Sequence, residues 1–144
     1  TTGRARRCGW LDTVILKYSV MVNTIDSIAL TKLDVLTGLK KIKICTGYKY
    51  EGKIYNDMPC HQTIMHKCQP IYEEFDCWNE DISKVKNFED LPGSAQDYIK
   101  NIEKIIKVPV SMISVGAERS KIILRDDNLK GRLFDQTGRS TLII

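Results

Sequence analysis

The alternation of apolar and polar positions along the chain predicts short strands separated by helices. Residues 28–30 form a short apolar run without a helical period, with a long helical pattern before it and turn residues after it. Such a run is typical of a buried strand in an α/β sheet, because both faces of that strand are covered. We therefore expect this strand to be central in the fold.

Two helices are predicted, one before and one after this strand in the sequence. The first follows Asp12, a suitable N-cap residue, and ends at Asn23 and Thr24. It is apolar nearly all round, which predicts a buried helix. The second begins at Leu91 and Pro92 and carries an apolar stripe with charges on the opposite face. That stripe consists of Ala95, Tyr98, Ile99, Ile102, Ile105 and Ile106.

Further strands are predicted from alternating or short apolar runs. One is a hairpin at 41–50 and 53–55 with one solvent-exposed face. The others are strands at 70–75 and 110–115 and an edge strand at 121–124. The predicted fold class is α/β, with a mainly parallel sheet flanked by helices and a small antiparallel hairpin region. From Arg125 the periodicity is lost, so we divide the chain into a folded part at 1–125 and a loosely held tail at 126–144.

Composition narrows the function classes. In 144 residues there are 22 basic and 18 acidic side chains, a net charge of +4. This mild surplus suits phosphorylated small molecules, and we expect neither nucleic acid nor a membrane as partner. Five cysteines form an odd set without a C-x-x-C pair, which indicates free thiols in a reducing, cytoplasmic environment. The chain starts with Thr1 instead of Met, so we expect a fragment of a larger domain.

The residues after the central strand carry the first candidate site. Lys32 and Asp34 lie just past its carboxyl end, where open α/β sheets place ligands. A carboxylate there can accept hydrogen bonds from N1–H and the 2-amino group of guanine, while the lysine stem lies along the purine. The alternative is that Asp34 caps the turn at 35–36 and Lys32 is merely solvated.

The amino-terminal segment is the second candidate site. It combines hydroxyls, a glycine and guanidinium groups, in the order Thr1, Thr2, Gly3, Arg4, Ala5, Arg6, Arg7. A glycine loop frees backbone N–H groups for an anion, and arginine binds carboxylate or phosphate with a two-pronged fork. The alternative is a solvated, frayed basic terminus.

Four runs of residues, in order and spacing, resemble the carboxyl-terminal third of adenylosuccinate synthetases over residues 1–124. The runs are Thr1-Thr2-Gly3-Arg4 with 6–12, then 30–36, then Leu91-Pro92 with Ala95-Gln96 and Tyr98-Ile99, and finally Ser114-Val115-Gly116. Thr-Lys-x-Asp in the second run is similar to the guanine-specificity motif of GTP-using proteins. The resemblance implies a P-loop-NTPase-like sheet.

The resemblance also implies an activity and roles for residues. The family joins inosine monophosphate (IMP) and L-aspartate at the cost of GTP, giving adenylosuccinate, GDP and phosphate in AMP biosynthesis. Aspartate and IMP binding would fall to Thr1, Thr2, Gly3, Arg4 and Arg6. GTP binding would fall to Arg6, Lys32, Leu33, Asp34, Ser114, Val115 and Gly116. No catalytic or metal-binding residue is expected in this segment, and the partners implied are the three substrates and a second subunit of a homodimer.

The resemblance places the glycine-rich phosphate loop, the catalytic residues and most Mg²⁺ ligands in the amino-terminal part of the family, so the segment alone is expected to be inactive. Two residues depart from the family pattern. Cys77 replaces a glycine before Trp78, which would strain the loop if that position had positive φ. Ala117 replaces a proline after Ser-x-Gly, which puts the rigidity of that turn in question.

Two other function classes remain open. Cys60, His61, His66 and Cys68 could form a small structural zinc module, although adjacent Cys60 and His61 can rarely face one metal. A non-catalytic module that binds guanine nucleotides or RNA could use the arginine-rich terminus, although the chain lacks basic strands flanked by aromatic residues.

Overall fold

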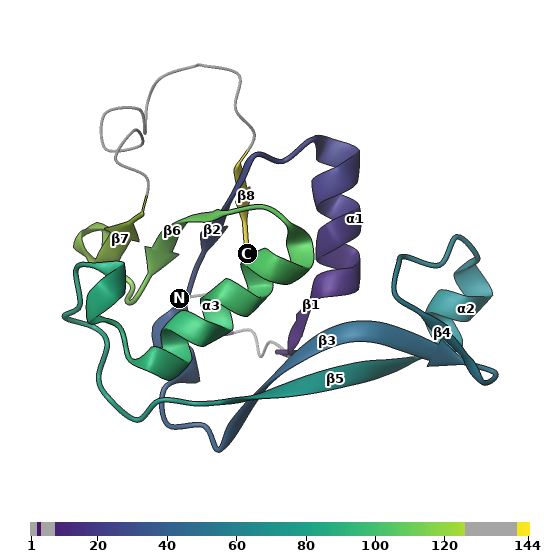
Figure 1. Ribbon diagram of the computed structural model, residues 1–144, viewed down its shortest axis with the longest axis horizontal. Coiled ribbons are helices and arrows are strands. Elements are labelled where there is room, and N and C mark those ends of the chain that lie inside the picture. Colours follow the sequence, from purple (N-terminus) through teal and green to yellow (C-terminus); the bar gives the residue numbers. More distant parts are fainter. Residues whose placement is uncertain (1–2, 4–7, 126–140) are drawn as a thin grey trace.

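The computed structural model describes residue 3, residues 8–125 and residues 141–144. Two sheets and three helices organise these residues (Figure 1). The helices are α1 (Thr13–Asn23), α2 (Gln62–Lys67) and α3 (Gly93–Ile106), and the 3₁₀ turns are η1 (Leu33–Leu36), η2 (Phe88–Asp90) and η3 (Arg119–Lys121). The predicted α/β class is confirmed.

The first sheet contains the predicted central strand. Its strands are β2 (Ser27–Leu30), β6 (Val110–Ser114), β7 (Ile122–Leu124) and β8 (Thr141–Ile143), in the order β7-β6-β2-β8. β2 is parallel to both of its neighbours, and β7 is antiparallel to β6. This mainly parallel sheet brings the carboxyl ends of β2 and β6 to the same edge.

The second sheet is mostly antiparallel. It consists of β1 (Leu11–Asp12), β3 (Lys41–Tyr50), β4 (Lys53–Tyr55) and β5 (Gln69–Asp76). β3 and β4 form the predicted hairpin, β5 runs antiparallel along β3, and β1 is parallel to β3. In Figure 1, β3 and β5 make a long ribbon that ends beside α2.

Helix α3 covers the first sheet because its apolar stripe is continuous. Its buried residues are Ala95, Tyr98, Ile99, Ile102 and Ile106, as the spacing predicts. They belong to one core with Ile28 of β2, Ile113 of β6 and Trp78. The helix ends where Lys107 adopts a left-handed conformation with φ of 58°.

The first helix has the predicted ends but not the predicted burial. Asp12 caps α1 by accepting hydrogen bonds from the backbone N–H groups of Val14 and Ile15, and Thr24 is the C-cap. Val14 and Leu16 are buried, whereas Met21 is 69% exposed. The prediction of a buried helix was wrong, because described neighbours cover only one side of α1. Its exposed apolar side chains are Ile15, Tyr18, Met21 and Val22.

Three elements were not anticipated from the sequence. β1 has two residues, and α2 lies in a stretch without a clear apolar period. β8 falls in the segment predicted to be a tail, of which residues 126–140 lie outside the described residues. None of the helices among the described residues is long and apolar enough to cross a membrane.

Candidate functional site

The turn that follows β2 has an uncommon backbone. Lys32 has φ of 60° and ψ of 34°, a left-handed conformation that lysine adopts at a cost of about 1–2 kcal/mol. The other non-glycine residues with positive φ among those described are Thr24 and Lys107, which end helices, and Glu51, in the hairpin turn. Lys32 instead turns the chain directly from a buried strand into η1, and its own side chain is exposed.

Asp34 lies in η1 with a buried oxygen that is not paired. Its Oδ1 atom has no hydrogen-bond partner among the described residues, and no side chain caps the start of η1. This oxygen therefore does not serve as the turn cap that the alternative interpretation required. Leaving such a buried acceptor unpaired costs about 1–3 kcal/mol, so the site favours a ligand with a donor group.

Leu33 fixes this turn on the sheet. Its side chain is 1% exposed and belongs to the main core, while Lys32 and Asp34 on either side of it are more accessible. η1 also packs against β6. One buried leucine thus holds the predicted motif on the sheet, with an exposed lysine before it and a half-buried aspartate after it.

The end of β6 provides the second part of the site. Leu30 at the end of β2 pairs with Ile113 of β6, so Ser114 follows at the same edge of the sheet. Ser114 Oγ donates to the carbonyl of Gly116 at 2.8 Å, and Val115 N–H donates to the carbonyl of Lys121 at 2.9 Å. A Cβ at Gly116 would lie 3.0 Å from Cγ of Lys121, so glycine lets the two segments approach.

The loop that contains Cys77 and Trp78 holds the carboxyl end of η1, a connection that the sequence did not predict. Trp78 Nε1–H donates to Thr37 Oγ1 at 2.9 Å, and Gly38 N–H donates to the Trp78 carbonyl at 2.9 Å. The Cys77 thiol donates to the carbonyl of Leu36 at 2.9 Å. Cys77 is not among the described residues with positive φ, so the strain considered for this position does not arise.

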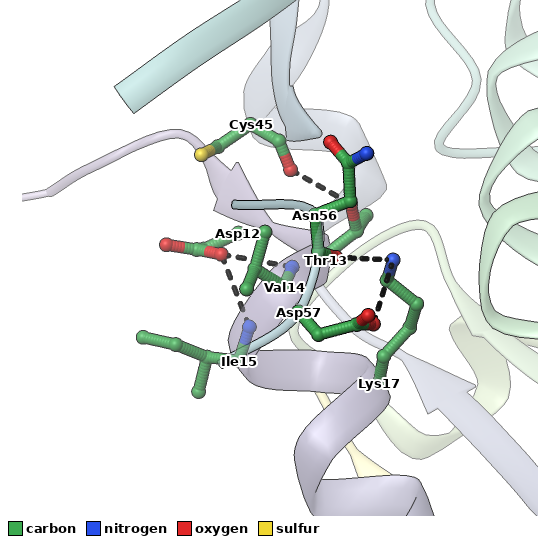
Figure 2. Close-up of polar contacts among 8 residues, drawn as sticks. All are labelled: Asp12, Thr13, Val14, Ile15, Lys17, Cys45, Asn56 and Asp57. Atoms are coloured by element: carbon green, nitrogen blue, oxygen red, sulfur yellow. Dashed lines mark hydrogen bonds and ion pairs between the residues drawn. The ribbon is translucent and has the colours of Figure 1, made fainter. Parts of the chain in front are cut away.

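A polar cluster at the start of α1 anchors the chain just after the arginine-rich segment (Figure 2). Asp12 Oδ1 accepts from the N–H groups of Val14 and Ile15 at 3.0 and 3.2 Å. Asp12 Oδ2 accepts from Tyr48 Oη at 2.6 Å, and burial together with this hydrogen bond raises the pKa of Tyr48. Thr13 Oγ1 donates to the carbonyl of Cys45 at 2.7 Å.

The same cluster reaches the loop after β4. Lys17 Nζ donates to the carbonyl of Asn56 at 2.7 Å and lies 3.8 Å from Asp57 Oδ1. Figure 2 shows Lys17 pointing from α1 toward this loop. The start of α1 is therefore tied to β3 through Asp12 and Thr13, and Lys17 ties the helix to the loop after β4.

The predicted amino-terminal site is only partly described. Gly3 is exposed and has φ of 61°, with nothing within 4 Å of a Cβ built on it. Thr1, Thr2, Arg4 and Arg6 lie outside the described residues. Their assignment to aspartate and IMP stays a prediction.

The zinc alternative finds no support in the described residues, where no three His, Cys, Asp or Glu side chains gather in a way that could hold a metal ion. His61 Nδ1 instead accepts from Thr63 N–H at the start of α2, and the Cys68 thiol donates to the carbonyl of Met65. All five cysteines carry free thiols.

Comparison with known proteins gives a consistent result. The family model for adenylosuccinate synthetase matches residues 1–123. An adenylosuccinate synthetase from a Thermoanaerobacter species is 61% identical over 127 residues, which are 88% of this chain and 30% of the relative. The enzyme of Clostridioides difficile is 52% identical over 125 residues, 87% of this chain and 29% of the relative.

A solved structure agrees with these relatives. Fully ligated adenylosuccinate synthetase from Plasmodium falciparum superimposes with a TM-score of 0.81 and 43% identity, over 88% of this chain and 31% of that one. The chain thus spans about 30% of the length of the curated relatives it matches.

Proposed function

We propose a guanine-binding role in a ligase for this chain, which belongs to the adenylosuccinate synthetase family. In this proposal the turn after β2 and the end of β6 bind the base of GTP. The segment before α1 binds L-aspartate and IMP. The complete protein would join these two substrates to give adenylosuccinate, GDP and phosphate.

The observation that carries the proposal is the unpaired, buried Oδ1 of Asp34. Guanine presents two neighbouring donors, N1–H and the 2-amino group, which match the two oxygens of a carboxylate. Each hydrogen bond to a charged group contributes about 1.5–3 kcal/mol net. Binding guanine would therefore relieve the unpaired acceptor and select against bases that lack these donors.

The neighbouring residues suit the remaining faces of a purine. Lys32 is exposed next to Asp34, so its methylene stem can lie along the ring while its ammonium group stays in water. Ser114 ends β6, and Val115 and Gly116 follow it at the same sheet edge. We infer that backbone groups of this turn meet the O6 edge of the base. The Leu33 backbone lies between the two polar side chains.

The amino-terminal residues Thr1, Thr2, Gly3, Arg4 and Arg6 are proposed to bind the carboxylates of aspartate and part of IMP, with Arg6 also near GTP. Two observations support this location. Gly3 has the positive φ that a tight anion-binding loop uses. The Asp12 cluster fixes the point at which this segment joins α1.

Mg²⁺, which the family implies, does not fit the described residues, because they contain no cluster that could hold a metal ion. We assign its ligands, and the groups that do the chemistry, to the parts of the relatives that this chain does not span. Catalysis of phosphoryl transfer depends on positioning and charge stabilisation of the γ-phosphate. The 144-residue chain alone is therefore proposed to be inactive, and the complete protein to act as a cytoplasmic homodimer.

A chimera tests the proposal. The matching 127 residues of the 61% identical Thermoanaerobacter enzyme are replaced by those of this chain, and kcat/KM is measured with GTP and with inosine triphosphate. Inosine triphosphate lacks the 2-amino group, so we expect it to be used about 10- to 100-fold less efficiently. Equal use of both nucleotides would contradict guanine recognition by this segment. The isolated chain, assayed with GTP, IMP, aspartate and Mg²⁺, should give no adenylosuccinate.

A further inference from the structure

The loop after β5 contacts three consecutive residues at the end of η1. The Cys77 thiol donates to the carbonyl of Leu36 at 2.9 Å. Trp78 donates from its indole N–H to Thr37 Oγ1 and accepts at its carbonyl from Gly38 N–H, both at 2.9 Å. Cys77 and Trp78, called the Trp78 loop below, therefore fix the chain directly after the turn that carries the aspartate of the candidate site.

The Trp78 loop is itself anchored on α3 and in the core. Ser94 Oγ, in the first turn of α3, donates to the carbonyl of Cys77 at 3.2 Å. Trp78 is 1% exposed, and the centroid of its ring lies 6.4 Å from that of Tyr98 in α3. Leu33 of η1 belongs to the same hydrophobic core as these two rings. The end of η1 is thus held, through this loop, by a helix that is distant in the sequence.

The turn needs support from outside itself. Lys32 has the left-handed backbone, and Asp34 Oδ1 is buried without a hydrogen-bond partner among the described residues, so two features of η1 cost free energy. Such features persist where the surrounding structure holds them in place. The hydrogen bonds within the turn are long, since Val35 N–H lies 3.2 Å from the carbonyl of Lys32, and Thr37 N–H lies 3.2 Å from that of Asp34. The shorter bonds to the Trp78 loop supply the support.

We propose that Trp78 and Cys77 are positioning residues for base recognition, which act on the nucleotide through Asp34. This inference rests on the guanine-binding role proposed above. A carboxylate that accepts two parallel hydrogen bonds depends strongly on its orientation. Guanine requires both oxygens of Asp34, whereas hypoxanthine offers N1–H alone and requires one. A loosened η1 therefore weakens the use of GTP more than the use of inosine triphosphate, and the discrimination between the two falls.

Paired variants at two positions test this role in the chimera described above. Thr37→Val removes the acceptor of the indole N–H, and Thr37→Ser keeps a hydroxyl there. We expect Thr37→Val to lower the ratio of kcat/KM for GTP to that for inosine triphosphate by about threefold to tenfold, and Thr37→Ser to keep the parent ratio. Cys77→Ala should lower the ratio by about twofold, because a thiol is a weak donor, and Cys77→Ser should restore it.

The form of the kinetic change separates positioning from a loss of folded protein. The base is at the opposite end of the nucleotide from the γ-phosphate, so Thr37→Val should raise KM for GTP and leave kcat within about twofold. A variant that only destabilises the fold lowers the active fraction equally for both nucleotides and leaves the ratio unchanged. Ile102→Val removes a methylene group from the same core and no hydrogen-bonding group, and is the control for this effect.

The decisive comparison combines Thr37→Val with Asp34→Asn. If the Trp78 loop acts through Asp34, Thr37→Val has no further effect on the nucleotide ratio once the carboxylate is replaced. An unchanged ratio in Thr37→Val alone overturns the inference, and so does an equal drop with and without Asp34→Asn. Equal use of GTP and inosine triphosphate by the parent chimera would be a different result, because it contradicts guanine binding by this segment and removes the basis of the inference with it.

Discussion

Trp78 donates a hydrogen bond of 2.9 Å from its indole N–H to the hydroxyl of Thr37, and so connects the core to the turn that carries Asp34. The tryptophan is 1% exposed and lies close to Tyr98 of α3, with ring centroids 6.4 Å apart. Thr37 follows η1 directly, and its N–H donates to the carbonyl of Asp34 at 3.2 Å. The position of Asp34 therefore depends on a residue 44 positions later in the sequence.

Thr37→Val tests this connection. Valine keeps the size of threonine but removes the acceptor, and the buried indole N–H is left unpaired. We expect a loss of about 1–3 kcal/mol in the free energy of unfolding, measured by urea denaturation followed by circular dichroism. Thr63→Val, at an exposed position of α2, is the matched control.

A double-mutant cycle separates the hydrogen bond from packing. Trp78→Phe alone loses core volume, and together with Thr37→Val it removes both partners. If the bond is real, the double variant is less destabilised than the sum of the single variants by on the order of 1 kcal/mol. Strict additivity of the two changes would show that Thr37 and Trp78 are not coupled.

Arg125 provides a second test, because it joins three elements. Its Nη1 atom lies 2.5 Å from Glu103 Oε1 of α3 and donates to the carbonyl of Val110 in β6 at 3.1 Å. The guanidinium carbon lies 4.0 Å from the ring centroid of Phe88. Glu103 Oε1 also accepts from Val110 N–H at 2.7 Å.

Glu103→Ala should destabilise the chain by about 2–3 kcal/mol, because it leaves both the Arg125 charge and the Val110 N–H without this acceptor in a partly buried setting. Arg125→Lys should cost less, since lysine keeps the charge but not the planar fork that lies over Phe88. Thermal unfolding of both variants measures the difference. Glu74→Ala, which removes a more exposed ion pair with Lys43, is the control and should cost under about 1 kcal/mol. An equal loss for Glu103→Ala and Glu74→Ala would contradict the joining role of Glu103.

The alkaline stability of the chain should depend on Tyr98. Burial raises the pKa of Tyr98 to about 12, whereas a tyrosine in the unfolded chain has a pKa of about 10. Between these values the unfolded state loses a proton that the folded state keeps. The contribution of Tyr98 to the free energy of unfolding is therefore complete below pH 10. It falls by about 1.4 kcal/mol per pH unit as the pH rises toward 12.

Tyr98→Phe should flatten this alkaline decline, measured as the free energy of unfolding between pH 8 and about 11.5. Tyr18→Phe, on the exposed side of α1, is the control for loss of a tyrosine hydroxyl. Tyr48 also has a raised pKa, from burial and then its hydrogen bond to Asp12, and contributes to the decline with the same sign. A slope that Tyr98→Phe leaves unchanged would assign the decline to other groups.

The extent to which the sequence predicted this structure differs between elements for physical reasons. In α3, Ile99, Ile102 and Ile106 recur at the helical period and so predict a helix with one buried face. The unbroken apolar run 28–30 predicts a strand that is buried on both faces. Helix α1 was predicted to be buried because composition does not say whether a covering partner is present. β8 pairs with β2 across more than 100 residues, and no local signal predicts such a contact.

The candidate site shows the same limit. Lys32, Leu33 and Asp34 were found from a local motif at a strand end. The roles of Trp78 and Cys77 in fixing that motif depend on tertiary hydrogen bonds to Thr37 and Leu36. A buried tryptophan in a polar loop was the available signal, since a buried indole N–H requires an acceptor nearby.

The prediction that tests guanine recognition most directly concerns Asp34. In Asp34→Asn one carboxylate oxygen becomes an NH₂ group, which faces a guanine donor instead of accepting from it. Losing both charge-assisted hydrogen bonds costs on the order of 10²- to 10³-fold or more in the use of GTP. Xanthine carries a carbonyl in place of the 2-amino group, so the new NH₂ finds an acceptor there. In the chimeric enzyme, kcat/KM for GTP should fall while that for xanthosine triphosphate rises, with little change in KM for IMP and aspartate. Asp26→Asn, at an exposed position just before β2, controls for loss of a carboxylate near the strand. If the preference does not move toward xanthosine triphosphate, Asp34 does not bind the base, and its unpaired oxygen needs a different donor.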